Sequence, residues 1–186
     1  GELTAYVVEQ VANPARSVGL FRLSGVMLTA LFAPGAYLLG RRILDEWTAS
    51  LAGALIALNP FLLAHSRIVN GDASTAGLML LSLLAFLWLW HGSGWRMAAL
   101  SGALGGLALL TKLPSPLIVP FIGLLTIAGW WRDRDSPVMG DSPVKGRTGF
   151  WLRMLLVWGL TAVLVFVALW PAMWVDPLGT MQQMWY

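Results

Sequence analysis

Six apolar runs follow one another along this chain, at residues 20–39, 47–64, 73–90, 97–111, 116–131 and 150–170. Runs of about 18 or more apolar residues are long enough to cross a bilayer as helices. The chain is 58% hydrophobic and only 11% charged, whereas about a quarter of the residues in a soluble domain are charged. We therefore predict an all-α, polytopic transmembrane helix bundle with about six membrane helices and the lipid bilayer around it.

The distribution of lysine and arginine predicts how this bundle is oriented. Eight of these residues fall on one side of it: Arg41, Arg42, Arg96, Arg132, Arg134, Lys145, Arg147 and Arg153. Four fall on the other side: Arg16, Arg22, Arg67 and Lys112. Cytoplasmic loops carry an excess of basic residues, so the first side is predicted to be cytoplasmic and both chain ends to lie outside.

The same pattern divides the chain into three parts. We expect residues 1–19 to end an outer loop with an interfacial helix, residues 20–171 to form the transmembrane core with a cytoplasmic loop at 132–149, and residues 172–186 to begin another outer loop. The net charge of +3 gives no indication of nucleic-acid binding, and the lack of cysteine excludes disulfides and thiolate metal sites. Because the chain begins with Gly1 rather than Met, we expect a fragment of a longer protein.

Small residues and prolines predict local features of the helices. Ala98, Gly102 and Gly106 are spaced four apart, with Gly105 beside them, a pattern that lets two helix backbones approach closely. The fourth and fifth runs are short, and TKLPSP between them favours a close helical hairpin over a re-entrant pair. Pro34 and Pro60 fall inside the first two runs, where each removes a backbone hydrogen bond and is expected to kink the helix.

Four charged residues lie on or near the predicted outer face: Arg22, Arg67, Asp72 and Lys112. Each has a structural explanation. Asp72 can cap the helix that follows it, Lys112 can neutralise carbonyls at a helix end, and the arginines can anchor the chain at the interface. Alternatively, three cations and one carboxylate on one face suit a lipid phosphate, which arginine binds through two hydrogen bonds and lysine through a compact charge.

Several stretches resemble a known family in order and spacing. FRLSGVMLTALFAPGAYLLGRRI, AGALIALNPFLLAHSRIVNGDA, GALGGLALLTKLPSPLIVP and ALWPAMWVDPLGTM are similar to segments of the membrane core of GT-C glycosyltransferases. Within that group the chain resembles the protein O-mannosyltransferases and lipid A aminoarabinose transferases of glycosyltransferase family 39. The resemblance extends from about residue 20 to about residue 180.

The resemblance implies a membrane glycosyltransferase that moves a sugar from a polyprenyl-phosphate donor to an acceptor protein or lipid on the non-cytoplasmic face. It implies that Arg22, Arg67, Asp72 and Lys112 line the donor-facing cavity. Lys112 and Arg67 would contact the phosphate, and Asp72 would position the donor or its own loop. The expected location is a bacterial inner or plasma membrane, with the active face extracytoplasmic.

The catalytic carboxylate is where the chain departs from the family. In the family this group lies in the first outer loop, but Glu2 and Glu9 do not sit in the family's acidic motif. We therefore assign no catalytic residue, expect the base before residue 1, and expect the fragment alone to be inactive. No cofactor is assigned: no cluster of histidine, cysteine and carboxylate has metal-ligand spacing, although a divalent metal on the donor phosphate is left open.

Two other functions are compatible with the sequence. The chain could be part of a transporter or flippase, but its charges lie at helix ends, and no Asp, Glu or Lys falls at mid-span as ion coupling requires. It could also be a non-catalytic scaffold subunit of a glycosyltransferase. An acidic pair in a first outer loop of the full-length protein would favour the enzyme over the scaffold.

Overall fold

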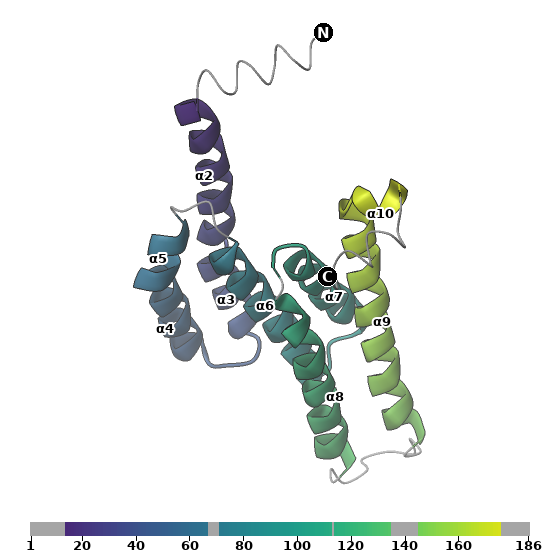
Figure 1. Cartoon of the computed structure of the whole chain (residues 1–186). Helices are drawn as coiled ribbons and strands as arrows, with labels where there is room; N and C mark the ends of the chain where they lie inside the picture. Colours follow the sequence, from purple (N-terminus) through teal and green to yellow (C-terminus); the bar gives the residue numbers. More distant parts are fainter. Residues whose placement is uncertain (1–13, 67–70, 113, 135–144, 176–186) are drawn as a thin grey trace.

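The computed structural model describes residues 14–66, 71–112, 114–134 and 145–175, which are helical apart from short turns (Figure 1). The helices in chain order are α2 (Pro14–Ala30), α3 (Phe32–Gly40), α4 (Glu46–Ala57), α5 (Pro60–Ser66), α6 (Asp72–Leu87), α7 (Trp95–Leu109), α8 (Ile118–Arg134), α9 (Lys145–Leu169) and α10 (Ala172–Val175). Two short 3-10 helices, η1 (Trp88–His91) and η2 (Ser115–Leu117), complete them. The predicted all-α class is confirmed.

Helix α6 lies between two groups of helices (Figure 1). On one side it contacts α2, α3 and α5, and α4 packs against α3. On the other side it contacts α7 and α8, and α9 packs against both of these. Helix α6 therefore contacts helices from both the N-terminal and the C-terminal part of the chain.

Within the described residues, three helical segments are long and apolar enough to cross a membrane: Asp72–His91, Ser115–Asp133 and Thr148–Leu169. They coincide with the third, fifth and sixth apolar runs, and the shorter apolar helical segment Gly25–Gly40 overlaps the first run. On α9, leucines four residues apart are more than half exposed: Leu152, Leu156, Leu160 and Leu164. Such a face suits lipid. The structure is that of a helical membrane protein. That the chain crosses the membrane six times stays a prediction.

The first apolar run is interrupted at Leu31, one turn before Pro34. Pro34 has no N–H to give to the carbonyl of Ala30, four residues earlier, where α2 ends. The Leu31 N–H instead donates to Leu28 O at 3.1 Å, and the Gly35 N–H resumes the helical pattern to Leu31 O at 2.9 Å. The break predicted from the proline is present, and it separates α2 from α3.

The second run is divided more completely, because Pro60 begins a new helix instead of bending an old one. Helix α4 ends at Ala57 and α5 begins at Pro60. Between them the Asn59 side chain accepts hydrogen bonds from the N–H groups of Phe61 (2.9 Å) and Leu62 (3.3 Å). Asparagine is a favoured N-cap and proline a favoured first residue, so these two residues define the start of α5.

Helix α4 also begins with a side-chain cap. The Asp45 carboxylate accepts from the Thr48 hydroxyl at 2.7 Å and from the Thr48 N–H at 2.9 Å. These hydrogen bonds, the one from the hydroxyl first, hold the pKa of Asp45 below its ordinary value, because they stabilise the ionised form. The turn between α3 and α4 is thus ordered by a local charge.

Glycines and serines bring α6, α7 and α9 together. A Cβ on Gly102 or Gly106 would overlap the backbone carbonyl oxygen of Trp158 or Ala162 on α9, which confirms the close approach predicted from the small residues. Between α6 and α7, the hydroxyls of Ser82 and Ser101 each donate to the other residue's carbonyl oxygen at 2.7 Å. Both serines are fully buried, so this reciprocal pair fixes the register of the two helices.

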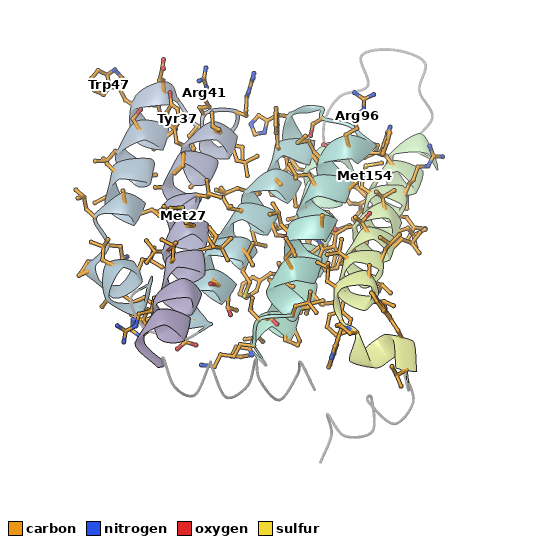
Figure 2. The ribbon with its side chains drawn as sticks, turned by 90° about the horizontal axis from the view of Figure 1, so that it is seen from above. Met27, Tyr37, Arg41, Trp47, Arg96 and Met154 are labelled. Atoms are coloured by element: carbon orange, nitrogen blue, oxygen red, sulfur yellow. The ribbon has the colours of Figure 1, made fainter. Side chains whose placement is uncertain are left out.

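The two ends of the bundle differ in charge. Figure 2 shows Arg41, Trp47 and Arg96 at the same end of the bundle, as the distribution of basic residues predicts. At this end the guanidinium groups of Arg42 and Arg132 lie over the rings of Trp88 and Trp90 of η1, which follows α6. Asp72, the first residue of α6, lies at the opposite end of this helix. That this second end faces away from the cytoplasm stays a prediction.

Candidate functional site

Asp72 is the first residue of α6. The helical hydrogen-bond pattern begins at Gly71, whose carbonyl accepts the Thr75 N–H at 2.8 Å. The N-cap residue is therefore Gly71, which has no side chain to cap the helix. Asp72 was expected at the N-cap and lies one residue later, so that expectation is wrong by one position. A carboxylate in the first turn is still stabilised by the positive end of the helix dipole.

Lys112 lies outside the helices, three residues after α7 ends at Leu109. Its backbone carbonyl accepts two hydrogen bonds from Ser115, one from the N–H at 3.0 Å and one from the hydroxyl at 2.5 Å. Ser115 itself is fully buried. The turn that carries Lys112 is therefore attached to η2 through its backbone, which leaves the ammonium group available for other contacts.

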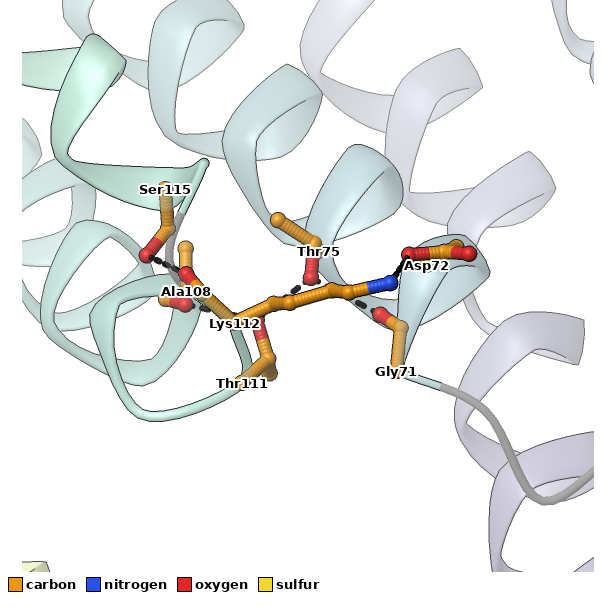
Figure 3. Close-up of polar contacts among 7 residues, drawn as sticks. All are labelled: Gly71, Asp72, Thr75, Ala108, Thr111, Lys112 and Ser115. Carbon is orange, nitrogen blue, oxygen red and sulfur yellow. Dashed lines mark hydrogen bonds and ion pairs between the residues drawn. The ribbon is translucent and has the colours of Figure 1, made fainter.

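The ammonium of Lys112 donates to the Asp72 carboxylate, joining two residues 40 positions apart (Figure 3). The side chains are 44% and 32% exposed, respectively. A pair that is partly open to its surroundings contributes about 0–1 kcal/mol to stability. This pair is therefore accessible to a ligand and makes at most a small contribution to folding.

Beneath the ion pair, one contact between two hydroxyls joins α6 to the turn after α7, and each hydroxyl also contacts a carbonyl of its own segment (Figure 3). The hydroxyls of Thr75 and Thr111 are 2.6 Å apart. The Thr75 hydroxyl is also 2.8 Å from Gly71 O, and the Thr111 hydroxyl is 2.6 Å from Ala108 O. Thr75 is buried, so this network lies on the inner side of the ion pair.

Of the four predicted site residues, the structure brings together Asp72 and Lys112. Arg22 is exposed on α2, eight residues beyond the start of this helix at Pro14, and it makes no hydrogen bond or ion pair with the part of the chain that the structure describes. Arg67 lies outside the described residues. The helix that carries Arg22 packs against α5 and α6, so Arg22 is on a neighbouring element.

Thr75, Thr111 and Gly71 were not predicted from the sequence. A weak signal was present: Thr75 follows Asp72 by three residues and so shares its helix face, and Thr111 directly precedes Lys112. His65 has a local role, since its Nδ1 is 3.0 Å from Phe61 O and its ring stacks on the Phe61 ring at 4.0 Å. Within the described ranges, no group of three or more histidine, cysteine, aspartate or glutamate side chains is placed to hold a metal ion.

The helices and the charged site at one end of them define a polytopic helical membrane protein. The sequence pattern of the dolichyl-phosphate-mannose-protein mannosyltransferase family matches residues 16–138, which are 123 of the 186 residues. The chain belongs to this family and is a membrane glycosyltransferase of the GT-C type, which confirms the resemblance. Comparisons with curated proteins and with solved structures gave no significant match.

Proposed function

We propose that this glycosyltransferase takes its sugar from a polyprenyl-phosphate-linked donor, and that Lys112 and Asp72 form part of the donor site. The single observation that carries the proposal is their half-exposed ion pair at one end of the bundle. The name of the family, which specifies dolichyl-phosphate-mannose, supports this class of donor.

The chemistry of sugar transfer explains what a lysine does there. An acceptor hydroxyl oxygen bonds to the anomeric carbon, the bond from that carbon to the phosphate oxygen breaks, and the phosphate takes the electron pair. Negative charge therefore grows on the phosphate, and a fixed ammonium beside it stabilises the transition state more than the ground state. Lys112 provides that ammonium, and Arg22 and Arg67 are proposed as further phosphate contacts.

Asp72 is assigned to orienting Lys112 instead of to proton transfer, because its carboxylate is already held by the ammonium. The proton of the acceptor hydroxyl goes to a different carboxylate base, for which we name no residue. The acceptor is proposed to be a protein or lipid on the non-cytoplasmic face, because the site lies at the end of the bundle opposite Arg42 and Arg132.

The test is sugar transfer by the full-length protein in proteoliposomes, with labelled polyprenyl-phosphate-mannose as donor. Lys112→Ala and Asp72→Asn are expected to lower the rate more than about tenfold, equivalent to about 1.4 kcal/mol of transition-state stabilisation. Arg96→Ala is the matched control, an exposed cation at the other end of the bundle (Figure 2), and is expected to transfer normally. Normal transfer by Lys112→Ala would refute the assignment of the site.

A further inference from the structure

The position of the Lys112 side chain is not set by a helix. The chain leaves α7 at Leu109 and enters η2 at Ser115, so the ammonium can be placed accurately only if the intervening turn is held against the rest of the bundle. The ion pair to Asp72 is a weak constraint, because both side chains are partly exposed and such pairs are easily broken. The two hydrogen bonds from Ser115 to Lys112 O attach the turn to η2 but not to α6, so another contact must fix the turn against α6.

The hydroxyls of Thr75 and Thr111 make that contact, 2.6 Å apart. Each hydroxyl has one proton, so two protons serve three short contacts: the one between them and those to Gly71 O and Ala108 O. Both carbonyls also accept a backbone N–H, from Thr75 at 2.8 Å and from Thr111 at 3.0 Å. The bond between the hydroxyls can therefore form with either threonine as donor, and no carbonyl loses its last partner.

The lack of a Cβ at Gly71 lets the two segments approach closely beside the hydroxyls. A Cβ on Gly71 would lie 3.1 Å from Thr111 O, closer than ordinary contacts allow. Gly71 and Thr111 directly precede Asp72 and Lys112, respectively. The spacing of the charged pair thus follows from the approach of the two residues before it.

We propose that Thr75 and Thr111 are positioning residues, which hold the Lys112 ammonium in register with Asp72 and so in place for the donor phosphate. The effect on sugar transfer depends on the proposed function, whereas the effect on the position of Lys112 does not. These hydroxyls act through Lys112 and need no contact with the substrate.

Chemical labelling of Lys112 tests the positioning without any assay of transfer. Lys112 and Lys145 are the two lysines of the sequence, so Lys145 provides an internal reference. Reductive methylation needs an amine that is free to attack the reagent, and in the folded protein the Lys112 nitrogen is held by the Asp72 carboxylate. Labelling of Lys112, measured by mass spectrometry on folded full-length protein, therefore reports how well the pair with Asp72 is maintained.

The variants Thr75→Val and Thr111→Val keep the shape of the side chain and remove the hydroxyl. Each is expected to increase Lys112 labelling relative to Lys145 by about fivefold, as for the loss of one hydrogen bond, and to lower kcat more than it raises KM. Thr75→Ser and Thr111→Ser restore the hydroxyl and should behave as wild type. Thr126→Val is the matched control, because among the described residues the hydroxyl of this buried threonine bonds only to Ile122 O of its own helix, at 2.8 Å.

The outcomes separate the positioning from the proposed function. Unchanged Lys112 labelling in Thr75→Val and in Thr111→Val would overturn the proposal. An equal increase in Thr126→Val would overturn it too, because the change would then reflect general loosening of the bundle. Labelling of Lys112 could increase in Thr75→Val and Thr111→Val but not in Thr126→Val, while the wild type transfers no sugar from any polyprenyl-phosphate donor. In that case the positioning role is upheld and the proposed function fails.

Discussion

The packing of α7 on α9 leads to a prediction about Gly102→Ala. The added Cβ would overlap the carbonyl oxygen of Trp158 and lie 3.0 Å from the Thr161 Cβ, whereas ordinary contacts are 3.4–4 Å. The obstacle is a backbone oxygen 2.4 Å from the added Cβ, so the two helices have to separate by about 1 Å to restore an ordinary contact of 3.4 Å. Overpacking of this kind costs about 1–3 kcal/mol, and a gap of about 0.5–1 Å along the rest of the interface removes about a quarter to a half of each contact's attraction.

Two other glycines provide matched controls for this change. A Cβ on Gly159 of α9 or Gly123 of α8 would have no neighbour within 4 Å. Alanine is favoured over glycine within a helix by about 0.5–1 kcal/mol, so Gly159→Ala and Gly123→Ala are expected to be as stable as wild type or slightly more stable. The substitution is the same at all three positions, and only its surroundings differ.

The assay is the free energy of unfolding in detergent micelles, obtained by titration with a denaturing detergent and followed by helical circular dichroism. Gly102→Ala is expected to lose about 1–3 kcal/mol relative to Gly159→Ala. If the two variants unfold at the same denaturant concentration, α7 and α9 do not pack as closely as the structure has them, and the argument from Gly102 is wrong.

Three further predictions concern the charged groups and the orientation. The double variant of Lys112→Ala with Asp72→Asn should show a coupling in unfolding free energy of at most about 1 kcal/mol, and a larger value would mean that the pair is mainly structural. A cysteine at exposed Pro114, in a chain without cysteine, should react with a membrane-impermeant thiol reagent on intact cells, whereas one at exposed Gly94 should not; the reverse pattern would contradict the orientation. At pH values above about 4, Asp45→Asn should lower thermal stability slightly, and at lower pH it should have no effect. The reason is that a depressed pKa stabilises the fold only where the carboxylate is ionised. A difference in stability that persists in acid would exclude this cause.

The helices could largely be predicted from the sequence, because the apolar runs and their punctuation are local signals. Pro34 and Pro60 indicated the interruptions of the first and second apolar runs. They did not indicate that Asn59 would cap a separate helix after the second interruption. The close approach of α7 was predictable from Gly102 and Gly106, since small residues at this spacing have few other roles in a membrane. Which helix packs against these glycines depends on the fold, and no local pattern in the sequence identifies it.

The site was predicted only in part. Asp72 and Lys112 could be identified because charge is costly near a bilayer, and the structure pairs them. The contact between Thr75 and Thr111 joins residues 36 positions apart, and a threonine in an apolar run gives no sign of whether it bonds to its own helix, as Thr126 does, or to a distant turn. Polar contacts that depend on a tertiary approach need the fold before they can be recognised.

Photo-crosslinking of the donor would test the central claim most directly. A polyprenyl-phosphate sugar with a photoreactive group next to the phosphate would be bound to the full-length protein, irradiated, and the labelled peptides identified by mass spectrometry. The account predicts label on the segments around Asp72 and Lys112, and loss of this label in Lys112→Ala. Label confined to the opposite end, around Arg42, Arg96 and Arg132, would contradict it.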